Sequence, residues 1–486
     1  MQIIHQAPLA ALGLGAAFTV VWGVADPAMA LAEIKTYIGV GQCAMGDLVT
    51  PQQAKTYARE LAMINAREQA GVYLASYTRS SQANLTANEI TAIAGVITEV
   101  KGEVKYEQMP GEVHGLPVVV YTATLEANVD TDGIAAWLRQ SDEMKADMAR
   151  QSAAEKQEVQ GSLQKIENLS QAYTRADSQQ EKESIRNQFN EEDRHLSSIM
   201  KTRDAWLLYQ KKEYEKALAG FREAIDLDPQ YALPWTAMGV VYNSMGDRNK
   251  AMECHRKAID LDPKLANAYN NIGGIYDDMG DYKRGLEYYQ KAIALAPDNA
   301  VYQANIAYTY DKLGAYDKGI EHGQKAIQLN PESTVAYNNL GGIYDSMGEL
   351  DKAIACYEKV ISLDVNDAMA YCNMGVAFYK KGDKDKALSY LRQAVAIDYD
   401  LDIAHQSLGQ VYNDTKEYDR AVMHFKHAIE INPGYQSAYV GLTLAYWHLG
   451  KYQEALQAID KYLELDPGSE DAKKIRAAIQ NKLQHK

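Results

Sequence analysis

Cysteine is scarce in this 486-residue sequence, which contains four, at positions 43, 254, 356 and 372. They have neither the density nor the spacing of a disulfide framework or a zinc site. We therefore expect Cys254 and Cys356 to act as small apolar side chains inside a core.

Basic residues are also outnumbered. The 50 Lys and Arg residues stand against 65 Asp and Glu residues, which gives a formal net charge of −15. A general nucleic-acid binder needs a basic face that displaces the counterions of the phosphates. The charge balance therefore argues against that class of function.

The short motifs of the common enzyme classes are missing. We find no GxxxxGK(S/T), GxSxG, HExxH or CxxC pattern. Gly39 and Gly41 begin a phosphate-binding pattern, but residue 44 is alanine where the third glycine is needed. His424 and His427 are three residues apart on one predicted helix and lack a third ligand nearby in the sequence. We predict no enzyme activity, no cofactor and no metal site.

Long apolar runs are absent except for one near the amino terminus, at residues 8–24. Small residues follow it, from Ala28 to Ala32, as at a secretory cleavage site. Residues 1–32 are therefore predicted to be a signal peptide, although no Lys or Arg precedes the run. The alternative is a retained anchor helix, for which the run is short. We expect an exported protein of the periplasm or cell envelope.

What the sequence does have is a repeat. Prolines at 229, 263, 297 and 331 are 34 residues apart, and the same step reaches 433 and 467. A glycine series and an aromatic series run in register with them, beginning at Gly239 and Tyr242. A period held over this length is typical of a stacked repeat architecture.

The pattern Trp235-x-x-Met238-Gly239-x-x-Tyr242, followed by Ala251, Ala258 and Pro263, resembles the tetratricopeptide repeat (TPR), a helix-turn-helix unit. Eight units fit without insertion: 198–231, 232–265, 266–299, 300–333, 334–367, 368–401, 402–435 and 436–469. The resemblance implies a right-handed α-solenoid, so the fold class is mainly α. His255 and His405 fall at core positions. Gly319 and Gly323 should make the second helix of unit four the weakest. Residues 470–486 are predicted to be a capping helix.

A small α/β module is predicted for residues 33–140. Strands are expected at 34–40, 103–108 and 116–129, with one long alanine-rich helix from Pro51 to about Ser80 and a second helix from Thr86. This element order resembles a small domain of bacterial outer-membrane lipoproteins and the amino-terminal part of a flagellar-ring assembly protein. The resemblance implies an envelope-associated binding module.

Residues 141–197 connect this module to the repeats. Two sparse apolar stripes, one through Val159 and Ile166 and the other through Ile185 and Phe189, fit two helices of a coiled-coil-like antiparallel hairpin. A partly exposed helical spacer is the alternative. The connector would hold the module away from the first repeat or docked on it.

A row of asparagines marks the face that the solenoid would turn inward. The sixth residue of four successive units is Asn271, Asn305, Asn339 or Asn373, and Asn270 and Asn338 precede two of them. A side-chain amide can donate to and accept from a peptide unit, so a row of amides can hold an extended backbone. In TPR families asparagines at this position commonly do so, and the resemblance implies peptide binding here. The alternative is a solvated helix face.

Acidic residues stand farther along the same helices, at Asp277, Asp311 and Asp345, with Asp278 beside the first. Some TPR proteins clamp a carboxylate with Lys and Arg residues on this face, and we expect the central units here to lack them. A partner with a basic or amino-terminal segment is therefore favoured, against a plain solvated face.

These observations predict a non-enzymatic scaffold or adaptor of the bacterial cell envelope that binds an extended segment of another protein. Two alternatives remain: a subunit that recruits substrates for an envelope enzyme or assembly complex, and an enzyme with its activity in the α/β module. The sequence does not indicate the oligomeric state.

Overall fold

The computed structural model describes residues 35–45, 48–80, 98–113, 116–129 and 142–484. The predicted signal peptide and the helix expected from Thr86 lie outside these residues. The chain divides into two compact units, Met1–Ile275 and Tyr276–Lys486. No helix among the described residues is long and apolar enough to cross a membrane.

The first unit contains a three-stranded antiparallel sheet in the order β1-β3-β2. Its strands are β1 (Lys35–Met45), β2 (Thr98–Val113) and β3 (Leu116–Val129). Lys35 pairs with Val129, and β2 and β3 form a hairpin closed by Val113 and Leu116. The first two strands are longer than predicted, because their pairing with β3 continues past the alternating apolar residues.

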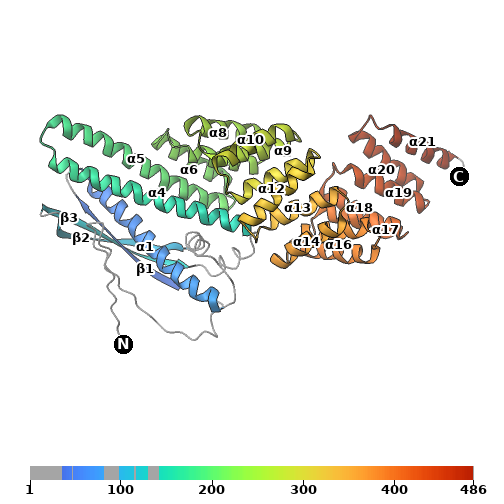
Figure 1. Cartoon of the computed structure of the whole chain (residues 1–486), viewed down its shortest axis with the longest axis horizontal. Coiled ribbons are helices and arrows are strands. Elements are labelled where there is room, and N and C mark those ends of the chain that lie inside the picture. The colour runs from blue at the N-terminus through green and yellow to red at the C-terminus, as the bar shows by residue number, and fades with distance from the viewer. Residues whose placement is uncertain (1–34, 46–47, 81–97, 114–115, 130–141, 485–486) are drawn as a thin grey trace. The chain divides into compact units, whose positions relative to one another are not determined.

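Helix α1 (Pro51–Ser80) covers one face of this sheet (Figure 1). Thr50 accepts a hydrogen bond from the Gln53 backbone N–H, as expected of a capping hydroxyl before a helical proline. Small side chains allow close packing here: alanines of α1 at 58, 62 and 66 lie in one core with Ala123, Leu125 and Ala127 of β3.

Helices α4 (Asp142–Arg175) and α5 (Gln179–Gln210) form a helical hairpin, the first of the two alternatives for the connector (Figure 1). The predicted stripes pack together, because Val159, Ile166, Ile185 and Phe189 are buried in one cluster. Ser198 and residues after it continue α5 into the first repeat, so connector and repeat share one helix.

The α/β module is docked on this hairpin through a buried ion pair. The Arg203 guanidinium of α5 donates to Glu60 of α1 at 2.7 Å, and the Glu60 side chain is 1% exposed. Burial raises the pKa of the Glu60 carboxyl, but the charge and hydrogen bonds of Arg203 outweigh it and hold that pKa below its usual range. Tyr57 of α1 also donates to Asp193 of α5, at 2.5 Å.

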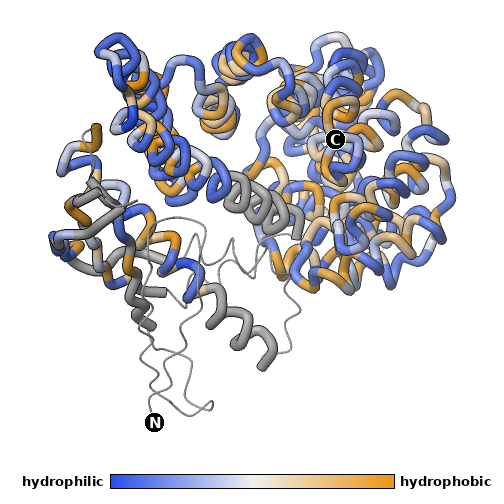
Figure 2. The backbone as a smooth tube through the Cα atoms, turned by 60° about the vertical axis from the view of Figure 1, so that its left-hand side comes forward, coloured by the Kyte–Doolittle hydropathy of each residue, from blue (hydrophilic) through white to orange (hydrophobic). Residues whose placement is uncertain are grey.

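The repeat helices alternate as first and second helices of each unit. After α5, the repeat helices of the compact unit Met1–Ile275 are α6 (Tyr214–Leu227), α7 (Leu233–Ser244), α8 (Arg248–Leu261) and most of α9 (Ala266–Asp278). The second unit contains α10 (Tyr282–Leu295), α11 (Ala300–Lys312), α12 (Tyr316–Leu329), α13 (Thr334–Ser346), α14 (Leu350–Leu363), α15 (Ala368–Lys380), α16 (Lys384–Ile397), α17 (Asp402–Asp414), α18 (Tyr418–Ile431), α19 (Gln436–His448), α20 (Tyr452–Leu465) and α21 (Glu470–Gln484). Hydrophobic and hydrophilic residues alternate along these helices (Figure 2), as amphipathic helices require.

Residues with a left-handed backbone conformation end the first helices of the repeats. Gly246, Gly280, Gly314, Gly348, Gly382 and Gly450 have φ between 70° and 85°. Lys212 and Lys416 occupy the equivalent positions, with φ of 60° and 65°. This backbone conformation is strained for a residue that has a Cβ atom.

The glycine series of the repeats is explained by close packing. A Cβ added to Gly409 would lie 2.8 Å from the Phe425 ring, and one on Gly341 would lie 2.6 Å from Tyr357. Each of these glycines therefore gives room to a large ring of the second helix in its own unit, as the repeat pattern predicts.

Candidate functional site

The first helices of the repeats lie side by side in the second unit, where α11, α13, α15, α17 and α19 contact one another in succession. We call their solvent-facing side the first-helix face. Asn305, Asn339 and Asn373 stand on α11, α13 and α15, and all three are half-buried. We call these three residues the amide row.

Asn339 shows how a member of the row is oriented. Its Nδ2 donates to the carbonyl oxygen of Ala304, on the preceding first helix, at 2.9 Å. This bond uses one of the two N–H donors of the Asn339 side chain and fixes the plane of the amide. The amide oxygen takes no part in the bond and remains available as an acceptor. The bond also shows that the residue contributes to the packing between units.

The other amides have different surroundings. Asn338 donates to Asp367 at 3.3 Å, and its own Oδ1 is buried without a partner. In the first unit of the chain, Asn270 donates to Asn271 at 3.5 Å, the limit of a hydrogen bond. The Asn373 side chain makes no hydrogen bond with the described residues.

The Asp277 carboxylate links two repeats. Thr309 of α11 donates its hydroxyl to Asp277 Oδ2 at 2.6 Å. Burial raises the pKa of Asp277 to about 6, although the hydroxyls of Thr309 and Tyr289 act in the opposite direction. This aspartate therefore serves the packing between units three and four.

Two lysines that the sequence reading missed neutralise the other aspartates. Lys312 lies 3.2 Å from Asp311 Oδ2, and Lys380 lies 2.5 Å from Asp345 Oδ2. The expectation of a first-helix face without lysine in the central units is wrong at these two positions. The signal was present, because both lysines are the thirteenth residue of their unit.

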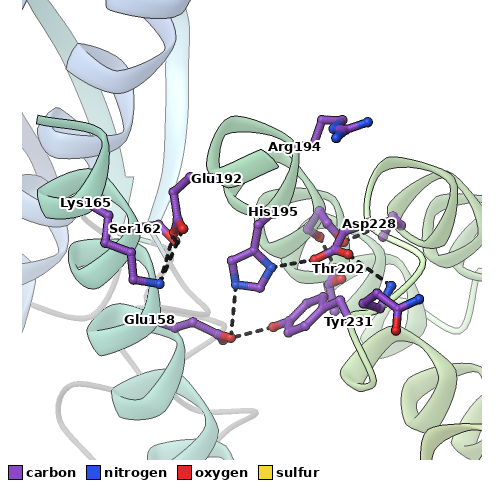
Figure 3. Close-up of polar contacts among 12 residues, drawn as sticks. Glu158, Ser162, Lys165, Glu192, Arg194, His195, Thr202, Asp228 and Tyr231 are labelled. Carbon is purple, nitrogen blue, oxygen red and sulfur yellow. Dashed lines mark hydrogen bonds and ion pairs between the residues drawn. The ribbon is translucent and has the colours of Figure 1, made fainter. Parts of the chain in front are cut away.

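A second polar group lies in the first unit, at the joint between the hairpin and the repeats (Figure 3). His195 of α5 stands between two carboxylates, with Nδ1 2.7 Å from Asp228 Oδ2 and Nε2 3.8 Å from Glu158 Oε1. The Tyr231 hydroxyl donates to Glu158 at 2.9 Å, and burial raises the pKa of Tyr231 far above its usual range.

This group borders a cavity of about 750 Å³ whose walls come from α4, α5 and the turn at residues 227–230. Its carboxylates already have donors, since Glu192 accepts from Ser162 at 2.6 Å and Asp228 accepts from the Gln230 backbone. We interpret the group as a structural joint. The sequence could not indicate it, because its members are up to 73 residues apart.

Sequence profiles of one family match most of the repeat region. Those described as TPR repeat match residues 207–246, 241–280 and 343–382. Those described as tetratricopeptide repeat match 266–299, 300–333, 322–355, 368–398 and 412–479. Together they cover more than half of the sequence. The chain is a tetratricopeptide repeat protein.

Several solved TPR structures are similar to it. A TPR protein from Parabacteroides merdae is 16% identical and covers 51% of this chain and 98% of its own, with a TM-score of 0.45. YrrB, described as a TPR protein with an unusual peptide-binding site, is 27% identical over 38% of this chain and 95% of its own, with a TM-score of 0.30. MamA is 31% identical over 33% and 95%, with a TM-score of 0.30. No curated protein matches.

Membership in the family gives the general class of function. TPR arrays mediate binding to proteins or peptides and are generally non-catalytic, because a stacked array offers an extended surface. This TPR protein is therefore a protein-interaction scaffold.

The histidines of the TPR array have packing roles. His405 is 2% exposed, and its Nε2 lies 3.0 Å from the Tyr399 carbonyl oxygen, to which it donates. Its Nδ1 lies 3.0 Å from His424 Nδ1, so one of the two rings must donate to the other. No third ligand stands near His424 and His427 in the sequence, but in the structure the centres of the His405 and His427 rings are 4.3 Å apart. Even so, the described residues contain no group of three suited to hold a metal ion.

Burial shifts the pKa values of two cysteines and one further histidine in the TPR array. Cys254 and Cys356 are buried and unpaired, and burial raises the pKa of each thiol to about 11. Burial also lowers the pKa of His255 to about 4. The prediction that these cysteines are core fillers is confirmed.

Proposed function

We propose that this TPR protein is an exported, non-enzymatic adaptor of the bacterial cell envelope that binds an extended segment of a partner protein on its first-helix face. The observation that carries the proposal is the orientation of Asn339. Its amide is fixed by the Ala304 carbonyl group, which leaves an oriented acceptor on a face of half-buried asparagines.

The amides are the main recognition groups in this proposal, and charge has a smaller part. Asp311 and Asp345 each have a lysine beside one oxygen, so they attract a basic segment less strongly than bare carboxylates would. Each net hydrogen bond contributes about 0.5–1.5 kcal/mol, so the three amides together contribute roughly 1.5–4.5 kcal/mol. That is enough to orient a peptide, and side-chain contacts must supply the rest of the affinity.

The test begins with a selection of random twelve-residue peptides displayed on phage against the full chain. Selected peptides are then measured by fluorescence anisotropy against a variant with Asn305, Asn339 and Asn373 changed to alanine. We expect the affinity to fall at least about tenfold, since roughly 1.5–4.5 kcal/mol is removed.

A matched control has three exposed asparagines changed to alanine, Asn249, Asn366 and Asn481, none of which belongs to the amide row. It should bind as the unchanged chain does. Thermal melting by circular dichroism must show that the variants remain folded, because Asn339 also joins two helices. If the amide-row variant is folded and binds as well as the control, the site is not on this face.

Export is tested separately. We expect the protein from a fractionated bacterial host to be in the envelope or periplasmic fraction, with an intact mass that lacks residues 1–30 or 1–32. A full-length mass in the cytoplasmic fraction would contradict the proposed location.

A further inference from the structure

The proline series of the repeats is interrupted at two successive turns, where Val365 and Tyr399 take the place of proline. The backbone does not explain the change. Asp364 and Asp398, which precede them, have ψ of 100° and 102°, close to the 95° of Asp262 before a proline. Neither Val365 nor Tyr399 uses its backbone N–H in a hydrogen bond within the described residues. A proline would therefore fit at both positions.

The side chains at these two positions are exposed. Val365 is 64% exposed and Tyr399 is 62% exposed, the highest values of any large apolar residue that the structure describes. Met369 follows Val365 by four residues and is 42% exposed. Such side chains add little to the stability of the fold, because folding removes little of their surface from water. Folding therefore does not explain why they replace a turn-forming proline.

Val365, Met369 and Tyr399 lie together, and we call them the turn patch. In unit seven, Asn432 of the turn donates to Asp402 at the start of the first helix, at 2.9 Å. Each turn therefore lies against the start of the first helix of its own unit. The equivalent pair in unit six consists of the two residues just before Tyr399 and Met369. The repeat geometry thus places Tyr399 beside Met369, which is one helical turn from Val365.

The Tyr399 ring is held in place although it is exposed. Its centre lies 4.5 Å from the centre of the His427 ring and 5.4 Å from that of His405. The backbone beside it is also fixed, because His405 donates to the Tyr399 carbonyl oxygen. A side chain that is already ordered loses little conformational freedom when a partner covers it, and this favours binding.

The surroundings of the turn patch are acidic. Residues 360–379 and 393–415 contain no Lys or Arg, whereas the two turns carry aspartates at 364, 367, 398, 400 and 402. The hydrogen bonds to these carboxylates come from backbone N–H groups and from the amides of Asn338 and Asn432. No ion pair within the described residues neutralises them. Their charge attracts a cationic ligand and repels an anionic membrane surface.

We propose that the turn patch is a second docking surface, for a segment of a partner protein that carries apolar side chains with Lys or Arg beside them. The apolar side chains of the partner cover Val365, Met369 and Tyr399, and its basic groups meet the aspartates of the two turns. This inference goes beyond the proposed peptide binding, because none of these residues belongs to the amide row.

The experiment uses a double variant of the full chain, Val365→Pro with Tyr399→Pro. It restores the residue of the other turns and removes the two most exposed side chains of the patch. It should melt at the same temperature as the unchanged chain or higher, because proline restricts the unfolded chain. The control is Met279→Ser with Met423→Ser, which removes two apolar side chains that are each 58% exposed and lie outside the patch.

The probes are random twelve-residue peptides displayed on phage. Peptides that bind the double proline variant are removed first, and the rest are selected on the unchanged chain. We expect the selected peptides to combine apolar residues with more Lys and Arg than the starting library. They should bind the proline variant at least about tenfold more weakly and the control within about twofold of the unchanged chain. Raising the salt from about 0.05 M to about 0.5 M should weaken their binding, since exposed charges are then screened.

Three results would overturn the proposal. The first is that no peptide survives the removal step, and the second is that the survivors have no excess of Lys or Arg. The third, from light scattering, is an unchanged chain that dimerises while the proline variant stays monomeric, which would assign the patch to a second copy of the chain. Peptides removed in the first step still serve to test the amide row, so failure of this proposal is distinguishable from failure of the proposed function.

Discussion

The hydroxyl of Thr309 donates to Asp277 Oδ2 at 2.6 Å and so connects the first helices of two successive repeats. The acceptor belongs to the acidic series that the sequence assigned to ligand binding. Its partner is 32 residues away, close to one repeat length. Residues at such a spacing are the ones that stacked units bring into contact.

Thr309→Val should destabilise the array. Valine keeps the shape of threonine but cannot donate, so the partly buried Asp277 carboxylate loses one of its two hydroxyl partners, Thr309 and Tyr289. The free energy of unfolding should fall by about 1–3 kcal/mol. Urea unfolding followed by circular dichroism measures the change, and Thr415→Val, at a threonine that donates only near its own helix end, is the comparison. An equal effect in both variants would argue against the role of the inter-repeat bond.

Unit seven should lose stability in mild acid because of His424. Burial, followed by the charges of His405, His427 and Arg392, lowers the pKa of His424 from 6.5 to about 4. Between these two values the unfolded chain binds the proton and the folded chain does not. The stability is therefore fully present above pH 6.5 and falls as the pH drops toward 4. His424→Gln should flatten this part of the curve of unfolding free energy against pH, and an unchanged slope would contradict the assignment.

The two glycines of α12 should respond differently to alanine. A Cβ on Gly323 would make ordinary contacts with Leu340, at 3.5 Å or more, so Gly323→Ala should stabilise the protein by about 0.5–1 kcal/mol. A Cβ on Gly319 would lie 2.9 Å from Ile343 and 3.2 Å from the Ala307 carbonyl oxygen, so Gly319→Ala should destabilise it. Melting temperatures of the two variants provide the comparison, and a reversed order would refute the packing argument.

Lys416→Gly should raise stability, because residue 416 has a φ of 65°. Removing the strain of a left-handed residue with a Cβ atom stabilises the fold by about 1–2 kcal/mol. The larger conformational freedom of glycine in the unfolded chain destabilises the fold by about 0.5–1 kcal/mol. A net gain of up to about 1.5 kcal/mol should follow in chemical denaturation. The reverse change at an equivalent position, Gly382→Lys, should lower stability by a similar amount.

The repeat fold could be predicted from the sequence because the period fixes both the helix ends and the residues that pack. Gly409 against Phe425 is such a case: one small residue and one ring recur at constant offsets. The roles of the polar residues could not be read in the same way. Whether Asp311 and Asp345 face a ligand or a lysine depends on side-chain directions between neighbouring helices, which a list of positions does not contain.

The α/β module shows the same limit. Alternation of apolar residues located β3, but the buried pairing of Glu60 with Arg203 joins residues 143 positions apart and has no local signal. The docking of the module on the hairpin therefore became evident only in the structure.

Hydrogen–deuterium exchange of the full chain, with and without a selected twelve-residue peptide, tests peptide binding on the first-helix face most directly. The account predicts that the peptide slows exchange in α11, α13 and α15 and leaves the second helices α12, α14 and α16 unchanged. Protection confined to the second helices, or to residues of the α/β module, would contradict it.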